Sequence, residues 1–292
     1  MPNAAAERNQ CGDRRDVSPV HARWESRVDE LSRSYAAAQP YPHIVLDGFL
    51  DDETVGAVAH AFPGPKDTEW IQYKHYNENK LGKSKREEFP PAIGALVDDL
   101  NSPEFVAFLS RLTGIEELMA DPMLEGGGMH QTESGGFLNI HADFTMHHYH
   151  KRWKRRCNLI IYLNAGWRPE WGGDLELWSR DMKRCESRIA PIMNRAVIFN
   201  TDDTSFHGYP EAIRCPAHVT RRSIALYYYS LETDPHCSAR STNYQARPTD
   251  GARRVLIWAD KMALHAYTRL KERFGFSDDA VSRVLARGRR KR

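Results

Sequence analysis

The stretch that decides the fold opens with Gly136-Phe-Leu-Asn-Ile-His141-Ala-Asp143 and closes with Arg221-Arg-Ser223-Ile-Ala-Leu-Tyr-Tyr-Tyr229. Both ends have the pattern of short strands, in which residues two apart share a face. His141 and Asp143 therefore point to one side of their strand, and Arg221 and Ser223 to one side of theirs. Glycine-rich turns separate further apolar runs, and this texture predicts a β-sandwich or barrel. The predicted strands are 122–131, 136–142, 157–164, 173–178, 186–192, 196–200 and 220–229.

Helices are predicted on both sides of this β segment, because apolar residues recur there at helical spacing. They cover 22–36, 51–62, 93–100, 103–113 and 253–274, with a short helix from Ser277 to near Gly288. A buried strand is predicted over 43–50, and residues 64–90 read as an irregular surface loop. The chain then divides into a disordered lead-in (1–20), a helical and strand support (21–121), a β core (122–231) and a C-terminal helical extension with a basic tail (232–292), all within one structural domain.

Composition narrows the class of protein. The 41 basic and 39 acidic side chains leave a net charge of only +2, so nothing favours a nucleic-acid or membrane-surface partner. No run approaches 18 apolar residues, and the N-terminus has no apolar signal core. The 5 cysteines form no Cys-x-x-Cys pair, which argues against a disulfide framework and a zinc knuckle. We expect a soluble cytoplasmic protein.

Three side chains have the chemistry of a metal site. His141 and Asp143 form a His-x-Asp pair, which by itself is common by chance. His207 follows the apolar run 196–200, and considered alone it is more simply a loop histidine. Two histidines and one carboxylate on one face of an iron leave three positions open for reaction. Arg221 would need an anion if it entered a barrel, although a solvated arginine pair at an edge strand fits the pattern as well.

Together these motifs bear a family likeness. Residues 126–230 resemble the Fe(II)- and 2-oxoglutarate-dependent dioxygenases, and especially their prolyl 4-hydroxylase-like branch. Cys157–Asn164, Gly172–Leu177 and Asn194–Phe199 match the strands between the motifs. The resemblance implies a mainly β core with flanking helices (α+β), a double-stranded β-helix of the jelly-roll or cupin type. It also assigns roles to particular residues: His141, Asp143 and His207 as iron ligands, Arg221 as the partner of the distal carboxylate of 2-oxoglutarate, and Ser223, Tyr162 and Gln131 near that cosubstrate.

The resemblance implies a reaction with Fe(II), 2-oxoglutarate and O2. An unactivated C–H bond of a small molecule, such as an amino acid or a biosynthetic intermediate, would be hydroxylated with release of succinate and CO2. Asp143 opposes halogenation, because halogenating relatives have Gly or Ala at that position. One alternative is a peptidyl prolyl or aspartyl hydroxylase, and another is a non-catalytic cupin-like binding module. A nucleic-acid demethylase finds no support in the charge balance.

Two loops are candidates for substrate selection, 64–90 and 144–156. The second contains His147-His-Tyr-His150 followed by six residues of which five are basic. This run fits a cationic rim that attracts an anionic substrate, and it fits a solvated loop equally well. A second metal at these histidines is disfavoured, because the resemblance uses only one histidine of this region.

Overall fold

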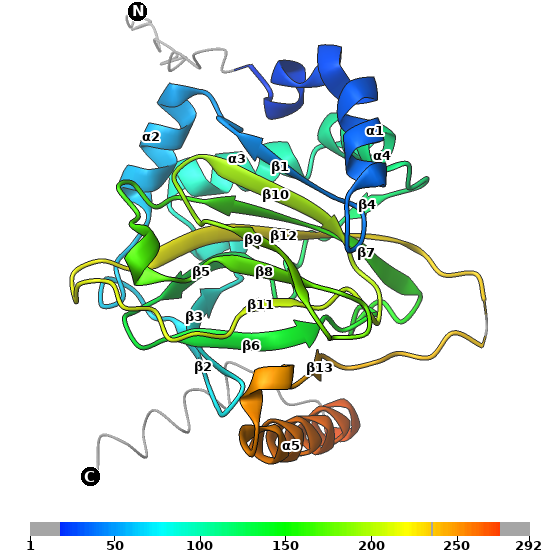
Figure 1. The fold of residues 1–292 in the computed structure, drawn as a ribbon. Coiled ribbons are helices and arrows are strands. Elements are labelled where there is room, and N and C mark those ends of the chain that lie inside the picture. The colour runs from blue at the N-terminus through cyan, green and yellow to red at the C-terminus, as the bar shows by residue number, and fades with distance from the viewer. Residues whose placement is uncertain (1–17, 235, 275–292) are drawn as a thin grey trace, which may run out of the picture.

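An antiparallel sheet of 13 strands dominates the computed structural model, which describes residues 18–234 and 236–274 (Figure 1). Its main path runs β1-β10-β7-β12-β5-β3-β6-β11-β8-β9, while β13 pairs with β6, β2 with β3 and β4 with β12. The strands are β1 (His43–Asp47), β2 (Ile71–Lys74), β3 (Glu78–Lys83), β4 (Met119–Ala120), β5 (Gly128–Thr132), β6 (Phe137–Ala142), β7 (Trp153–Tyr162), β8 (Leu175–Trp178), β9 (Cys185–Ile189), β10 (Arg195–Asn200), β11 (His207–Tyr209), β12 (Arg221–Leu231) and β13 (Asn243–Tyr244).

The sheet curls around one cavity. Strands β7 and β12, from one half of the path, and β6 and β11, from the other half, all contribute lining side chains. β3 joins the halves, since it pairs with both β5 and β6. Two antiparallel layers that face one another across a cavity form a double-stranded β-helix, and flanking helices complete the predicted fold class, which is confirmed.

Four helices cover the outer side of the β1-β10-β7-β12 layer, at the top of Figure 1. Two of these helices start at a capping side chain. Asp51 accepts a hydrogen bond from the backbone N–H of Thr54 at 2.8 Å, and Ser102 Oγ accepts one from Phe105 at 3.2 Å. Gly114 ends the last of them in the left-handed conformation that a side chain disfavours. These helices are α1 (Val28–Ala37), α2 (Asp52–Ala61), α3 (Pro91–Leu100) and α4 (Pro103–Thr113).

The structure corrects several boundaries. Residues 64–90 are not an irregular loop, because they contain the β2–β3 hairpin, which completes the sheet between β5 and β6. The strand predicted at 122–131 begins only at Gly128, after a turn. β7 begins at Trp153, four residues before the prediction, so part of the basic run is strand. The helix predicted at 22–36 starts as short 3-10 turns and becomes α-helical at Val28.

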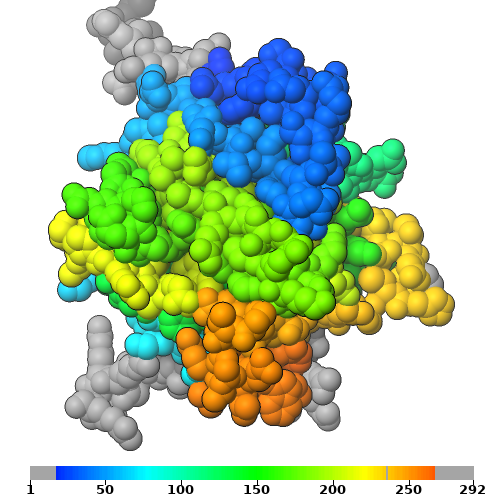
Figure 2. All heavy atoms as spheres, in the orientation of Figure 1, coloured from blue at the N-terminus to red at the C-terminus, as the bar shows by residue number. Residues whose placement is uncertain are grey.

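The C-terminal helix α5 (Arg253–Phe274) forms over the predicted residues, on the side of the sheet opposite α1–α4 (Figures 1 and 2). Apolar spacing predicts this helix, but its apolar residues Leu256, Ala259 and Ala263 are exposed, Leu256 at 52%. The less exposed face instead follows i, i+3, i+4 spacing and is mostly polar. Its members are Ile257, Asp260, Lys261, Leu264 and His265.

The remaining predictions concern the cysteines, membrane-spanning segments and the two ends of the chain. The four cysteines that the structure describes are all free. Within residues 18–234 and 236–274, every helix is too short or too polar to cross a bilayer. The helix from Ser277 and the basic tail lie outside the described residues, as does nearly all of the lead-in over 1–20.

Candidate active site

His141, Asp143 and His207 meet inside the curled sheet. His141 on β6 and His207 on β11 are partners in the antiparallel register, and their ring centroids lie 4.5 Å apart. Asp143 follows the end of β6 by one residue, with carboxylate oxygens 3.5 Å from His141 Nε2 and 3.6 Å from His207 Nε2. One potential ligand atom from each residue lies within 4.8 Å of the others. Strand pairing therefore brings together residues that are far apart in the chain.

The two imidazoles are oriented for metal binding. His141 Nδ1 lies 2.9 Å from the carbonyl oxygen of Asn139, and His207 Nδ1 lies 2.9 Å from that of Ser205. A carbonyl can only accept, so Nδ1 carries the proton in both rings and Nε2 presents its lone pair to the cluster. Burial also lowers the pKa of His207 to about 4, despite the opposing charge of Asp143. Its neutral form is the one that binds metals.

Asp143 is held as a carboxylate. Burial favours the protonated acid, but electrostatic attraction, above all to the Arg155 guanidinium, outweighs it, and the pKa of Asp143 falls well below its usual range. Arg155 Nη2 lies 2.9 Å from Asp143 Oδ2, and Asn158 donates to the same oxygen at 2.8 Å. The guanidinium is itself enclosed, with its central carbon 3.4 Å from the ring centroid of Tyr227. Oδ1 accepts no hydrogen bond from these two groups and remains available to a cation.

Arg221 enters the same cavity from β12. Its Nε donates to the carbonyl of Gly173 at 2.8 Å, and its Nη2 donates to the Tyr162 hydroxyl at 3.2 Å. The side chain is 5% exposed, yet it forms no ion pair with any carboxylate of the described residues. Gly173 has φ +80°, and a Cβ there would lie 3.2 Å from Arg221 Cδ, so glycine is needed for this approach. A buried cation without an anion is costly, and a bound carboxylate would remove that cost.

These groups share one cavity of about 80 Å³, which we call the inner cavity. Tyr162 and Ser223, both assigned from the resemblance, line it beside Arg221. Gln131 does not, because its side chain bonds to the carbonyl of Pro63 at 3.2 Å and to the Thr220 hydroxyl at 2.6 Å. Strand alternation turns the neighbouring His130 to the lining in its place.

The sequence patterns did not predict several of the residues that line the inner cavity. Lys80 comes from the hairpin that was predicted to be a loop, and it pairs with Glu78 at 3.3 Å. Arg155 and Asn158 belong to β7, and Arg155 was assigned to a rim or solvated loop. Alternation along β7 would not have predicted this position, because the pairing with β12 shifts beside Arg155 and brings it to the face of the even positions Asn158 and Tyr162. Tyr209 follows His207 by two residues on β11, a spacing that was visible once β11 was known to be a strand.

The other histidines of the region do not form a second metal site. Across the described residues, His141, Asp143 and His207 are the only grouping of three or more His, Cys, Asp or Glu with metal-binding spacing. His147 is fully buried between Asp121 and Glu125, at 3.4 Å from each. Its Nδ1 also accepts backbone N–H groups of Tyr149 and His150, so it organises the loop after β6.

The chain was compared with known protein families, curated proteins and solved structures. Residues 127–229 match the model of the 2OG-Fe(II) oxygenase superfamily. No curated protein sequence matches the chain. The match spans the strands that supply His141, Asp143, His207 and Arg221.

Solved structures with similar chain traces include a prolyl-4-hydroxylase from Pseudomonas putida, with 16% identity and a TM-score of 0.49 over 68% of this chain and 98% of that one. A prolyl hydroxylase from Trichoplax adhaerens, in complex with a hypoxia inducible factor peptide, has 18% identity and a TM-score of 0.47 over 71% and 93% of the two chains. HygX from Streptomyces hygroscopicus, with nickel, 2-oxoglutarate and hygromycin B bound, has 12% identity and a TM-score of 0.45 over 70% and 92%.

The donor set, two histidines and a carboxylate, is the one that non-haem Fe(II) oxygenases use. The family match covers the segment that carries it, and it agrees with the resemblance found in the motifs. Residues 127–229 of this chain are therefore a 2OG-Fe(II) oxygenase segment, and enzymes of that superfamily use Fe(II), 2-oxoglutarate and O2.

Proposed function

We propose that this enzyme hydroxylates an unactivated C–H bond of a small-molecule substrate, such as an amino acid or a biosynthetic intermediate, and releases succinate and CO2. His141, Asp143 and His207 would hold Fe(II). Arg221 would bind the distal carboxylate of 2-oxoglutarate, with Tyr162 and Ser223 beside it. The observation that carries the proposal is the buried Arg221 guanidinium, which has no carboxylate partner among the described residues and opens onto the cavity of the metal cluster.

Arg221 is a better candidate than Lys80 for the cosubstrate. Both cations line the inner cavity, but Lys80 already pairs with Glu78 at 3.3 Å. A planar guanidinium also matches a carboxylate with two parallel hydrogen bonds, which an ammonium group does not provide. The Tyr162 hydroxyl accepts from Arg221 and so can donate its own proton to a bound carboxylate.

The other residues prepare the site for chemistry. Bound Fe(II) supplies the activation of O2 that oxidises 2-oxoglutarate and the substrate C–H bond. Arg155 and Asn158 hold Asp143 ionised and fix its orientation, and Asn139 and Ser205 fix the two imidazoles. Buried apolar lining residues such as Leu175 and Ala225 reduce the water around the reacting groups.

The small-molecule proposal rests on the space beyond the metal cluster. A second cavity of about 370 Å³ adjoins it, and residues from four chain segments line it. This volume is within the range of small-ligand pockets. A peptidyl substrate is the alternative, and it would need a groove that admits an extended chain. A non-catalytic module is disfavoured, since it would not need an ionised, arginine-held Asp143 beside two oriented imidazoles.

A succinate-release screen tests the proposal. The Fe(II)-loaded enzyme is given 2-oxoglutarate and O2 together with amino acids, other metabolites or peptides. We expect one small-molecule class to raise succinate above the uncoupled background, with the hydroxylated product detected by mass spectrometry. Stimulation by peptides alone would establish the peptidyl alternative. Absence of succinate under every condition, with metal bound, would favour the binding module.

A further inference from the structure

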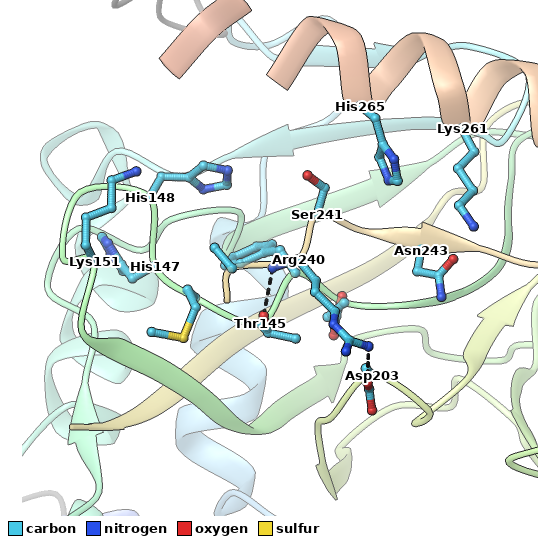
Figure 3. A pocket seen from close by; sticks show the side chains of 14 residues that line it. Thr145, His147, His148, Lys151, Asp203, Arg240, Ser241, Asn243, Lys261 and His265 are labelled. Atoms are coloured by element: carbon cyan, nitrogen blue, oxygen red, sulfur yellow. Dashed lines mark hydrogen bonds and ion pairs between the residues drawn. The ribbon is translucent and has the colours of Figure 1, made fainter. Parts of the chain in front are cut away.

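The cavity beyond the metal cluster, which we call the outer pocket, is lined partly by the segment that matches the superfamily and partly by residues beyond it, from 239–243 and α5. It meets the inner cavity at Asp143, which lines both. Figure 3 shows side chains entering it from the loop after β6, from residues 239–243 and from α5. The lining residues are Asp143, Phe144, Thr145, Met146, His147, His148, Lys151, Asp203, Ala239, Arg240, Ser241, Asn243, Lys261 and His265.

The outer pocket has more basic than acidic side chains in its lining. Its two acidic residues already have partners, because Asp143 pairs with Arg155 and Asp203 pairs with Arg240. His148 pairs with Glu125 at 2.5 Å. Lys261 has neither a hydrogen bond nor an ion pair with any described residue, and partial burial lowers its pKa. An unpaired ammonium at a pocket wall attracts an anion.

His265 adds a second unsatisfied group on the same wall. It lies one helical turn after Lys261, so both side chains leave α5 on one face, and Figure 3 shows both directed from the helix toward the pocket. Its Nε2 is buried and has no hydrogen-bond partner among residues 18–234 and 236–274. Buried polar atoms are nearly always paired in a folded protein, so an unpaired one that lines a cavity indicates a missing ligand.

The helix is fixed in the orientation that presents these groups. Asp260, next to Lys261, accepts hydrogen bonds from the His75 ring at 2.7 Å and from the Asn77 side chain at 2.7 Å. Asn77 in turn accepts from Asn139 Nδ2 at 3.0 Å, and the Asn139 carbonyl holds the His141 ring. A buried polar chain therefore connects α5 to a metal ligand, and it determines which helix face looks inward.

This orientation opposes the usual rule for helix packing. Trp258 is 60% exposed and Val255 is 62% exposed, while the polar Asp260, Lys261 and His265 on the inward face are only partly exposed. Burial of the apolar residues would stabilise the helix more. A ligand for the polar face explains the arrangement that apolar packing alone would not select.

We propose that the outer pocket binds the substrate through an anionic group, a carboxylate or a phosphate, held by Lys261 and His265 of α5. This inference rests on the proposed function and adds the chemical class of the substrate. The anion is held at the α5 wall, and the rest of the substrate extends toward Asp143, where the two cavities meet. The C-terminal extension is thus the part of the chain that selects the substrate.

The test uses inorganic phosphate and acetate as separate probes. The full-length enzyme is loaded with Co(II), a paramagnetic replacement for Fe(II), and with 2-oxoglutarate. Broadening of the probe's 31P or 1H resonance then reports binding near the metal. We expect saturable broadening by at least one probe, and a Kd about tenfold higher in Lys261→Gln, as expected for the loss of one hydrogen bond to a charged group. Phosphate alone or acetate alone would identify which anion the pocket prefers.

Matched variants make the result decisive. Lys261→Arg keeps the charge and should retain binding, while His265→Gln should weaken it less than Lys261→Gln does. Lys183→Gln removes a lysine that is 78% exposed on the β8–β9 hairpin and should change nothing. No saturable broadening, or equal affinity in wild type and Lys261→Gln, would overturn the inference. Succinate formed by the Fe(II) enzyme without substrate is recorded in parallel, because its absence with anion binding intact would count against the proposed function alone.

Discussion

The inner cavity and the outer pocket share Asp143 but differ in how they are built. Strand pairing in the matched segment 127–229 supplies most of the inner cavity, where Lys80, Asp143 and Arg155 form ion pairs and Arg221 forms none. The outer pocket takes Lys261 and His265 from a helix beyond that segment, and both lack partners among the described residues. The comparison teaches that the reaction and the choice of substrate reside in different parts of the chain.

The largest expected effect follows from removal of a proposed metal ligand. His207→Ala should weaken Co(II) binding to the apo-protein by at least about 100-fold, more than loss of a supporting residue does, and should reduce succinate to background. Isothermal titration calorimetry and a succinate assay measure the two effects. His60→Ala, at an exposed position on α2, is the control. Retained metal binding in His207→Ala would move the metal site away from the inner cavity.

Arg221→Gln should act on the cosubstrate. Loss of a buried cation that pairs with a bound carboxylate costs about 2 kcal/mol or more, or about 30-fold in affinity. The KM for 2-oxoglutarate should rise accordingly, while Co(II) affinity stays the same. The adjacent Arg222 leaves β12 on the other face and donates to Thr220, so Arg222→Gln is the matched control. A similar KM in both variants would assign 2-oxoglutarate to another cation, such as Lys80.

Arg155→Gln should have an intermediate effect, because it removes the group that orients Asp143. Supporting residues of this kind typically change metal affinity by about 10- to 100-fold. The comparison is with Arg156→Gln, whose side chain bonds to Ser230 on the other side of β7. Calorimetric titration of Co(II) into each apo-protein gives the affinities. Equal or tighter binding by Arg155→Gln would show that the guanidinium competes with the metal and does not support it.

The smallest effect concerns the attachment of α5. Burial opposes protonation of His75, but Glu78 and Asp260 outweigh it, and the pKa of His75 rises above its usual value. The contribution of the protonated ring to stability is therefore complete below about pH 6.5, the ordinary His pKa, and is lost as the pH rises through the raised pKa. Tyr244 packs on the same ring edge-on, without a charge at these pH values.

Hydrogen exchange of the α5 amides, corrected for the intrinsic rate at each pH, measures this attachment. Protection of α5 should fall a few-fold between about pH 6 and pH 8, the range in which histidines titrate. His75→Gln should remove that dependence. A dependence that persists in His75→Gln, or protection that rises with pH, would contradict the assignment.

The sequence predicts the position of a side chain in this protein well only where a regular spacing along the chain determines which face the side chain occupies. Two-residue alternation placed Arg221 on the inner face of β12 and Arg222 on the other, as the structure has them. The same alternation failed for Arg155, because the start of β7 lies in a basic run that resembles a loop and because the pairing with β12 shifts its register beside Arg155. Gln131 was placed by resemblance alone, and the structure turns it away from the cavity.

The C-terminal helix shows the other limit. Helical periodicity predicted α5 at 253–274, because that signal is local. Which face meets the core depends on the bond between Asp260 and His75, which are 185 residues apart. No local sequence pattern indicates a contact between residues so far apart. The spacing of the apolar residues therefore pointed to the wrong face of α5 as the inward one. Lys80 was missed for a similar reason, since β3 is stabilised by its pairing with β5 and β6 more than by its own residues.

Anaerobic addition of Fe(II) and 2-oxoglutarate tests the central claim most directly, because a visible charge-transfer band requires both to occupy the inner cavity together. Wild type, Lys261→Gln and Asp143→Ala are compared at a temperature where circular dichroism shows all three folded. We expect the band in wild type and in Lys261→Gln, and its loss in Asp143→Ala. No band in wild type, or an unchanged band in Asp143→Ala, would contradict the assignment of the reaction to the inner cavity.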